Sequence, residues 1–512
     1  MSSTRCSRSA LLPTALLALA ACSPGEGPEP ETQGPKNVVL FVCDTLRSDR
    51  LGCYGYFRDT SPRIDAWADG GTLYERNYSQ GCWTVPSMIS MFSGKYVFAE
   101  EEVLPNTPTL SEVLNDGGVF NAAFVCNDVL VRARGFRRGF HEFHRPPQGG
   151  RRATKLVEFF KDWWVEHEED IGLAEQRFFW LHAFDPHAPF EPDPALRPDE
   201  WEIGDDKRFY YTRTADSVEE AKSNALPDSW DFNRAVTKMS KDSMAYDGEV
   251  LGVDIGFGML LDFLEEKGEL DDTLILFAAD HGEKLYEHPL YPQEKNFKLE
   301  ANGGYPQGVA DIRTYSHRAF FRDELWNTPL IMAGPGVPSG QRVDSLSSNL
   351  DLYPTICAAF GLEAPEDLRG RNLLAEDPGE WERVHAYGFG TIASIEPEGT
   401  KFISHHPSRY LLEEDQPRPV ELLHVFEDPD ELELFNDRRP QEVERMNEVV
   451  SDWNASVQRP YSMDIPDEEF EALKNLGYMD YAQIEDRLKQ AATDGDGEGD
   501  SSPESSEDGS QE

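Results

Sequence analysis

Basic residues are scarce in this 512-residue chain: 48 lysines and arginines stand against 95 aspartates and glutamates, and the net charge is −47. A surface of this sign repels DNA, RNA and anionic lipid, so we expect no nucleic-acid partner. The excess of acidic residues is typical of solubility in a salty habitat. Calcium buffering by an acidic tail is the alternative.

Cysteines are also few, at seven in the whole chain. If Cys6 is removed with a leader and Cys22 carries an anchor, five remain. An odd number at irregular spacing does not form a disulfide framework. Cys43, Cys126 and Cys357 lie in apolar runs, so we expect them to be buried packing residues.

Only one apolar run approaches membrane length, LLPTALLALAA near the N-terminus. Two arginines precede it, which predicts a signal peptide over 1–21 rather than a membrane span. The four residues ending at Cys22 resemble a bacterial lipobox, in which the cysteine is lipidated, and a Pro/Gly/Glu-rich linker over 22–36 suits a tether. An ordinary signal peptide is the alternative. With Ser23 next in the chain, we expect an exported, soluble body anchored as a lipoprotein on the periplasmic side or in the outer membrane.

Short, nearly continuous apolar runs predict strands that are buried on both faces, as in a parallel sheet. The segment 250–268 has helical periodicity and leads into the fourth run, so strands and helices alternate. This alternation predicts an α/β fold with an open α/β/α sandwich and a mostly parallel central sheet. The runs are NVVLFVC (37–43), FNAAFVC (120–126), FFWLHAF (178–184), TLILFAA (273–279) and TPLIMAG (328–334).

The pattern changes beyond about residue 380 to short strands and turns, followed by the helical stretch EVERMNEVVSDWNASV. We therefore divide the chain into a main domain over 37–375 and a smaller C-terminal α+β subdomain over 376–480. The segment 490–512 is an acidic tail that we expect to be disordered.

Polar residues follow three of the predicted strands. Asp44 follows the first, Asp185-Pro186-His187 follows the third, and Asp280-His281-Gly282-Glu283 follows the fourth. Ligands of open parallel sheets bind beyond the carboxyl ends of the strands. Asp and His also cap helices and turns, but carboxylates and imidazoles at three strand ends predict a metal site.

The stretch GCWTVPSMISMFSG (81–94) contains several nucleophile candidates. Pro86 suits the first turn of a helix that ends before Gly94, so Thr84 lies at or just before the helix N-terminus. There the helix dipole and free N–H groups favour an oxyanion. A simple N-cap role for Thr84 is the alternative. Cys82 lies too early to face this opening, and Ser87 lies inside the helix.

From about residue 37 to 480 the chain resembles the sulfatase family of the alkaline phosphatase superfamily. That resemblance implies an alkaline-phosphatase-like fold and an ester hydrolase activity. The matching segments include NVVLFVCDTLRSDRLGCYGY, SQGCWTVPSMISMFSGKY, FFWLHAFDPHAPF, MAYDGEVLGVD, LILFAADHGEKLYEH, NTPLIMAGPGVPSG, DLYPTICAAFGL and ELLHVFEDPDELELFND.

The nucleophile motif departs from the family pattern. Sulfatases that use formylglycine carry C/S-x-P-x-R, and alignment on Pro86 places Thr84 at the nucleophile and Met88 at the arginine. Cys82 does not fit this spacing. Threonine carries a methyl group on its β-carbon, so it cannot be oxidised to the aldehyde hydrate. The Trp-Thr-x-Pro-Ser pattern resembles phosphoethanolamine transferases and phosphonate monoester hydrolases, in which the resemblance implies that Thr itself attacks.

The resemblance also implies a four-ligand metal centre of Asp44, Thr84, Asp280 and His281. Formylglycine sulfatases usually present an Asp-Asp pair and an Asp-Asn or Asp-Gln pair, whereas this chain has Asp-Thr and Asp-His. One carboxylate fewer and one imidazole more shifts the preference from Ca²⁺ toward Zn²⁺ or Mn²⁺.

Two further histidines match family positions, His187 and His317, and the resemblance implies that they contact the substrate anion or a second metal. A long insertion at 289–316 precedes His317. Turn and cap roles suffice for the other matching residues, which are Asp185, Asn127, Glu283 and His288. Lys284, Lys295 and Lys298 are too loosely placed to assign.

Three functions remain open on the sequence. The first is a metal-dependent hydrolase that cleaves a sulfate or phosphate-type ester of a small molecule, glycan or lipid through Thr84. The second is a phosphoethanolamine-type transferase, although such relatives usually carry several membrane helices. The third is a lipid-tethered, catalytically inactive binding protein, supported by Met88 at the arginine position and opposed by the retained carboxylates and histidines.

Overall fold

The computed structural model describes residues 34–96, 107–132, 135–147, 152–196, 232–285, 321–388, 391–405 and 420–457. The predicted signal peptide, Cys22 anchor, 289–316 insertion and acidic tail lie outside the described residues, as do His288 and His317. No helix in the described ranges is both long enough and apolar enough to cross a membrane.

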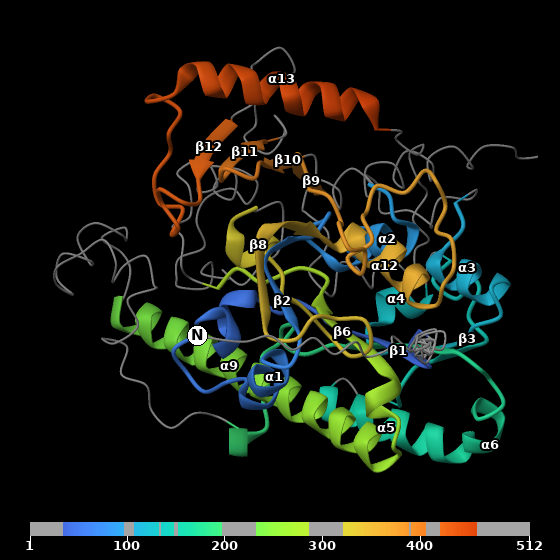
Figure 1. The fold of residues 1–512 in the computed structure, drawn as a ribbon. Helices are drawn as coiled ribbons and strands as arrows, with labels where there is room; N and C mark the ends of the chain where they lie inside the picture. The colour runs from blue at the N-terminus through green and yellow to red at the C-terminus, as the bar shows by residue number, and fades with distance from the viewer. Residues whose placement is uncertain are drawn as a thin grey trace, which may run out of the picture. The chain divides into compact units, whose positions relative to one another are not determined.

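Two sheets organise the described residues (Figure 1). The larger has eight strands in the order β4-β3-β5-β1-β6-β7-β2-β8, and the smaller has four in the order β12-β11-β10-β9. The strands of the larger sheet are β1 (Asn37–Cys43), β2 (Thr72–Tyr78), β3 (Phe120–Val125), β4 (Glu142–His144), β5 (Arg177–Ala183), β6 (Thr273–Ala279), β7 (Leu330–Ala333) and β8 (Gln341–Ser348).

The larger sheet is mostly parallel, as predicted. Its centre, β3-β5-β1-β6, is parallel throughout, and each of these strands coincides with a predicted apolar run to within a residue. The run 328–334 forms β7, which is antiparallel to both β6 and β2, so its expected direction was wrong. A continuous apolar run reports burial on both faces of a strand and carries no information about the strand's direction.

Helices cover both faces of this sheet, and β1 shows how. Val38, Leu40 and Val42 pack on one side, together with residues of α2 and α12, while Val39 and Phe41 pack on the other with α1, α5 and α9. The alternation is the two-residue period of a strand whose two faces are both buried. The predicted α/β/α sandwich is confirmed. On the first face lie α2 (Thr84–Ser93), α3 (Leu110–Asp116), α4 (Asp128–Arg132) and α12 (Leu352–Ala359); on the second lie α1 (Pro62–Ala68), α5 (Ala153–Glu166), α6 (Glu168–Ile171) and α9 (Phe232–Glu266).

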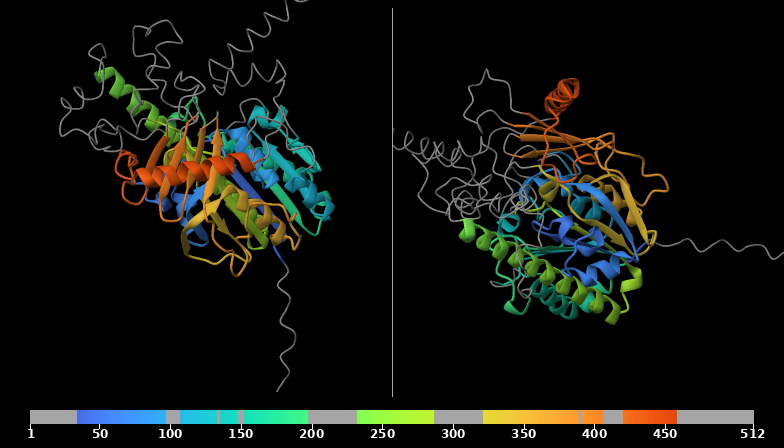
Figure 2. Two further views of the ribbon diagram at one scale, coloured as in Figure 1. Left: turned by 90° about the horizontal axis from the view of Figure 1, so that it is seen from above. Right: turned by 90° about the vertical axis from the view of Figure 1, so that its left-hand side faces the viewer.

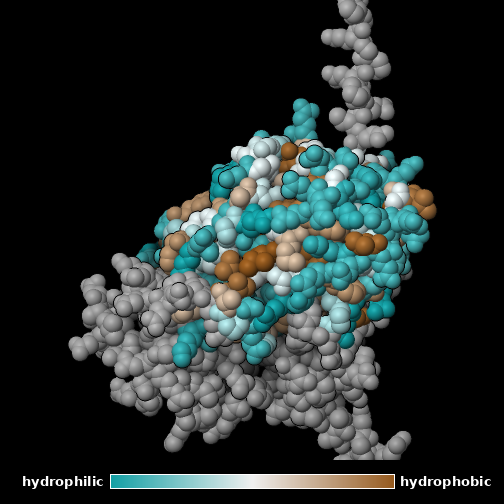
Figure 3. All heavy atoms as spheres, turned by 90° about the horizontal axis from the view of Figure 1, so that it is seen from below, coloured by the Kyte–Doolittle hydropathy of each residue, from teal (hydrophilic) through white to brown (hydrophobic). Residues whose placement is uncertain are grey.

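Helix α5 illustrates why the second layer forms. Leu156, Val157, Phe160, Trp163 and Trp164 are buried, and their spacing of three or four residues makes one apolar stripe. The predicted helix at 250–268 is the C-terminal part of α9. Figure 3 shows this side of the molecule from outside, where the surface is mainly hydrophilic with scattered hydrophobic residues.

The smaller sheet is antiparallel and follows the larger one in the chain. One face packs on α13 through Ile392, Phe402 and Met446. Figures 1 and 2 show α13 lying across the strands of this sheet. The other face of the sheet contributes Ile403 and Leu423 to the core that contains α2. The elements are β9 (Val384–Gly388), β10 (Thr391–Ile395), β11 (Thr400–Ser404), β12 (Val420–His424) and α13 (Pro440–Ser456); short helices elsewhere are η1 (Ser48–Arg50), η2 (Gly52–Tyr54), η3 (Pro194–Leu196), η5 (Leu270–Asp272), α11 (Asp323–Trp326) and η7 (Asn349–Asp351).

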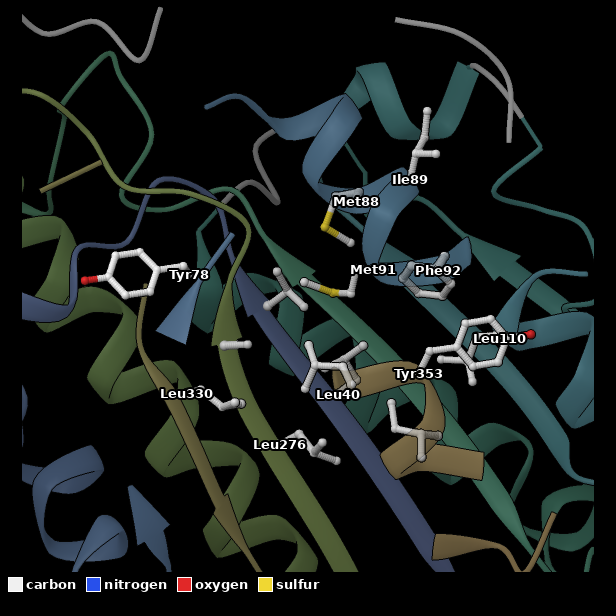
Figure 4. Packing of buried hydrophobic residues seen from close by; sticks show 14 of the residues in the cluster. Leu40, Tyr78, Met88, Ile89, Met91, Phe92, Leu110, Leu276, Leu330 and Tyr353 are labelled. Atoms are coloured by element: carbon white, nitrogen blue, oxygen red, sulfur yellow. The ribbon is translucent and has the colours of Figure 1, made fainter. Parts of the chain in front are cut away.

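Helix α2 begins at Thr84 and is entirely buried. It ends at Gly94, which has a φ of 67° in the left-handed region where glycine replaces other residues without strain. Figure 4 shows Met88 and Met91 of α2 among the buried hydrophobic residues that also include Leu40 of β1. Met88, which alignment on Pro86 is expected to place at the arginine position of formylglycine sulfatases, is therefore part of the apolar core.

Candidate active site and metal centre

The carboxyl ends of β1 and β6 place two aspartates side by side. The strands are parallel neighbours that end at Cys43 and Ala279, and the next residues are Asp44 and Asp280. Asp44 N–H donates to the Ala183 carbonyl at 3.0 Å and Asp280 N–H to the Cys43 carbonyl at 3.3 Å, so the strand ladder continues through both. Both carboxylates are fully buried.

The N-terminus of α2 brings Thr84 to the same place. Its Oγ1 lies 3.4 Å from Asp44 Oδ1 and 3.4 Å from His281 Nε2. His281 Nε2 lies 3.5 Å from Asp280 Oδ2 and 3.7 Å from Asp44 Oδ1. The four residues of the predicted metal set therefore lie together.

The distances between these donor atoms are close to those between the ligands of a single metal ion. Zinc binds oxygen and nitrogen at about 2.0–2.2 Å, so tetrahedral donors lie roughly 3.3–3.6 Å from one another. His281 Nδ1 lies 2.8 Å from the Gly282 carbonyl oxygen, which can only accept a hydrogen bond. Nδ1 of the neutral ring therefore carries the proton, and Nε2 presents its lone pair to the cluster. The donor set fits a divalent cation.

The electrostatics of the two carboxylates support the same fit. Burial, followed by the charge of Asp280, holds the pKa of Asp44 well above its usual range. Burial raises the pKa of Asp280 to about 6. Among the described residues, neither carboxylate forms an ion pair with a lysine or arginine. Two adjacent buried carboxylates without a compensating cation are costly, and a bound cation removes that cost.

Backbone and amide groups fix the orientation of both aspartates. Asn127 Nδ2 donates to Asp44 Oδ2 at 2.6 Å, while its Oδ1 accepts from Val129 N–H at 2.9 Å. Asp280 Oδ1 accepts from the N–H groups of Thr45 and His281, at 3.1 and 2.8 Å. A cap role alone, as expected for Asn127, is therefore incomplete, because this side chain also orients Asp44.

Other residues singled out in the sequence lie around this centre. His187 is buried, with Nδ1 2.6 Å from the Ala188 carbonyl, and its charge acts on the buried carboxyl of Glu283. Burial raises the pKa of Glu283 to about 7. Asp185 accepts a hydrogen bond from Ala153 N–H at 2.9 Å at the start of α5, which is the expected cap role. Lys284 is also buried.

The other nucleophile candidates are engaged elsewhere. Ser87 Oγ donates to the Gly81 carbonyl at 3.1 Å. Cys82 is buried, and its Sγ lies so close to Gly388 on β9 that a Cβ there would approach it to 2.2 Å. Thr84 is therefore the one hydroxyl of α2 with contacts to both Asp44 and His281 among the described residues.

His182 is the site residue that the sequence analysis missed. It lies on β5, one residue before the strand ends, and donor atoms of Asp44, His182 and Asp280 all lie within 4.8 Å of one another. The signal was present in FFWLHAF, where one imidazole interrupts an otherwise apolar strand.

A mostly parallel sheet between two helical layers, with carboxylates at its strand ends and a hydroxyl at a helix N-terminus, defines an alkaline-phosphatase-like fold. The solved structure of phosphonate monoester hydrolase from Agrobacterium radiobacter matches it with a TM-score of 0.60 at 18% identity, over 82% of this chain and 95% of that one.

The chain belongs to the sulfatase family of the alkaline phosphatase superfamily, because the sulfatase family model matches residues 36–362. The chain is 23% identical to N-acetylglucosamine-6-O-sulfatase of Bacteroides thetaiotaomicron, over 83% of this chain and 84% of that protein. It is 30% identical to choline-sulfatase of Rhizobium meliloti, over 65% and 69%. Enzymes of this family depend on a metal ion, and this chain is a sulfatase-like hydrolase of sulfuric or phosphoric ester bonds.

Proposed function

We propose that Thr84 is the nucleophile of a metal-dependent hydrolase that cleaves a sulfate or phosphate-type ester. The observation that carries the proposal is the convergence of Thr84 Oγ1, Asp44 Oδ1 and His281 Nε2 at separations of 3.4 to 3.7 Å. The first turn of α2 adds its dipole, which favours negative charge at this oxygen.

The ligands of the cation are Asp44, Thr84, Asp280 and His281 in this proposal, with Zn²⁺ or Mn²⁺ favoured over Ca²⁺ because one donor is an imidazole. When bound, the ion supplies Lewis-acid chemistry, lowering the pKa of the Thr84 hydroxyl and offsetting the charge of the transferred group. Asn127 holds Asp44 in position through the 2.6 Å hydrogen bond.

The first step forms a bond from Thr84 Oγ1 to phosphorus or sulfur, breaks the ester bond, and releases the alcohol. Asp44 Oδ1 lies 3.4 Å from Thr84 Oγ1 and can accept its proton, and the departing alkoxide gains a proton as it leaves as the alcohol. In the second step, water attacks the phosphorus or sulfur atom, the bond to Thr84 Oγ1 breaks, the sulfate or phosphate-type anion is released, and the hydroxyl is restored. We assign His187 to the substrate anion, and His317 to the same role from the sequence pattern alone.

The chemistry of threonine bears on whether the group transferred to it is a sulfate or a phosphate-type group. A formylglycine hydrate expels sulfate by eliminating it from its own carbon, whereas a sulfated threonine needs S–O hydrolysis. A phosphorylated threonine can be cleaved by an activated water. The nucleophile therefore supports phosphate, phosphonate or phosphodiester substrates, while the names of the sulfatase relatives support a sulfate ester of a sugar or small alcohol.

A trapping experiment tests the proposal. The metal-loaded enzyme is mixed with a panel of aryl sulfate, phosphate monoester, phosphodiester and phosphonate monoester substrates, quenched in acid and digested. We expect the added mass of one phosphate-type or sulfate group on the peptide that contains residues 83–88, from the substrates that turn over. Turnover with no label on that peptide, under conditions in which the second step is slowed, counts against Thr84.

We also propose that the enzyme is exported and held at a membrane by lipid on Cys22, from the lipobox-like sequence alone. A single acyl chain gives only marginal binding, so multiple acylation is required. Wild-type protein is expected in the membrane fraction and the Cys22→Ser variant in the soluble fraction. Mature soluble protein that begins after Cys22 would contradict anchoring.

A further inference from the structure

His182 is a fully buried imidazole whose two ring nitrogens have no hydrogen-bond partner among the described residues. A neutral imidazole carries one donor and one acceptor, and buried polar atoms of this kind are nearly always satisfied. On β5 it follows the apolar residues Phe178 and Trp180 on the face that α2 covers. This is the face on which Thr84 begins α2.

The second unsatisfied atom of the site faces the same point. Asp280 Oδ1 accepts two backbone hydrogen bonds, whereas Oδ2 has no hydrogen-bond partner in the described ranges. Two imidazole nitrogens surround this oxygen: His281 Nε2 at 3.5 Å and His182 Nε2 at 4.0 Å. Both separations exceed those of an N–H···O hydrogen bond.

These distances distinguish the two roles that His182 can have. An outer hydrogen bond that orients Asp280 requires roughly 2.7–3.2 Å between the donor and acceptor atoms. Donors bound to one ion at about 2.0–2.2 Å lie up to roughly 4.0–4.4 Å apart when they are on opposite sides of it. The 4.0 Å between His182 Nε2 and Asp280 Oδ2 lies within that range, and Asp44 offers a third donor atom close to both.

We propose that His182 is an additional protein ligand of the metal ion held by Asp44 and Asp280, so that the centre has two imidazole donors rather than one. This inference rests on the proposed function, because it concerns the same ion. It makes the site more nitrogen-rich than the four-ligand set and strengthens its preference for Zn²⁺ or Mn²⁺ over Ca²⁺.

The test uses the full-length protein stripped with a chelator and reloaded with Mn²⁺ alone. Pulsed electron paramagnetic resonance counts the imidazole nitrogens bound to the ion, and titration followed by the free Mn²⁺ signal gives its affinity. We expect two imidazoles in the wild type and one in His182→Ala, with affinity lowered about tenfold or more. His182→Gln should recover part of the affinity through its amide oxygen, without a second imidazole signal.

His385→Ala is the matched control, because His385 is also buried and its Nδ1 also lacks a hydrogen-bond partner within the described part of the chain. It lies on β9, stacked on Trp453, and should leave the nitrogen count and affinity unchanged.

A single imidazole in the wild type overturns the role of His182 and leaves the four-ligand proposal standing. The same holds for a folded His182→Ala variant with the wild-type count and affinity. A wild-type protein that binds neither Mn²⁺ nor Zn²⁺ instead overturns the metal site on which both proposals rest. The wild-type count needs no variant, so misfolding of His182→Ala does not prevent a decision.

Discussion

Two clusters of buried charged or ionisable groups in this molecule differ in how they are balanced. The strand-end cluster consists of Asp44, Asp280, His182 and His281. The subdomain cluster lies where the smaller sheet meets α11: Lys401 pairs with Asp323 and with Glu431, the latter at 2.6 Å, and Arg322 pairs with Glu421.

The difference separates a structural cluster from a functional one. The subdomain cluster contains its own cations, so its buried carboxylates are compensated within the fold. The strand-end cluster has two buried carboxylates and, among the described residues, no lysine or arginine in contact with them. Because the fold itself does not neutralise this buried carboxylate pair, it is the position where we propose that the cation binds.

The largest effect should come from the hydroxyl beside the strand-end cluster. Thr84→Ala should lower kcat by at least about 10³-fold, because it removes the attacking oxygen. The fold should be retained, because the N-cap of α2 is Trp83 rather than Thr84, and no side-chain capping hydrogen bond is lost. Thr84→Ser should keep part of the activity. Steady-state kinetics on the best substrate, with circular dichroism of each variant, measures both.

Cys82→Ala and Ser87→Ala are the controls for that experiment, and both should be much milder. A near-normal rate in Thr84→Ala, or complete loss of activity in Cys82→Ala alone, would mean that another group or a water attacks the substrate.

Breaking the subdomain cluster should lower the stability of the protein and leave its metal content unchanged. Lys401→Met leaves Asp323 and Glu431 without their shared cation and should lower the free energy of unfolding by about 3–5 kcal/mol. Urea denaturation measures this loss, and metal analysis of the folded variant should give the wild-type content. A variant as stable as the wild type would remove the contrast between the two clusters.

Weakening the strand-end cluster should lower the metal content and leave the stability of the metal-free protein nearly unchanged. His281→Ala should cut Zn²⁺ or Mn²⁺ occupancy about tenfold or more, with little change in the stability of the metal-free protein. Metal analysis after equilibration against a competing chelator gives the occupancy. Stoichiometric calcium in the isolated wild type, with no transition metal, would reject the predicted metal preference.

The smallest effect concerns His385, a buried imidazole on β9 that belongs to neither cluster. Burial lowers its pKa to about 3, below the usual value near 6.5, so the unfolded chain binds its proton first as pH falls. The stability that the neutral His385 side chain contributes to the folded protein is fully present above pH 6.5 and is lost as the pH falls toward 3. Between pH 7 and 5.5 the wild type should lose about 1 kcal/mol more stability than His385→Phe, measured by urea unfolding. Parallel pH profiles would contradict this.

The sequence predicted the parallel centre of the larger sheet well, because two-faced burial leaves uninterrupted apolar runs. It did not predict β2 or β8, whose polar and exposed residues hide the strand period, nor the direction of β7. The strand ends predicted a metal site at Asp44, Asp280 and His281, and the family resemblance added Thr84 at the helix start.

Contacts that depend on the direction of a side chain could not be predicted from the pattern of apolar and polar residues. His182 looked like part of a core strand, and only the register of β5 beside β1 brings it to Asp280. Asn127 resembled a simple turn residue until its second hydrogen bond, to Asp44, was visible.

The apolar setting of Met88 has a consequence for how the enzyme becomes active. Formylglycine relatives must have a residue of the finished polypeptide oxidised before they can work. A site built on Thr84, with Met88 packed against the core, needs no such maturation. If Thr84 is the nucleophile, as we propose, folding and metal binding are enough for activity, and production in a host without the oxidising machinery should yield protein as active as that from the native one.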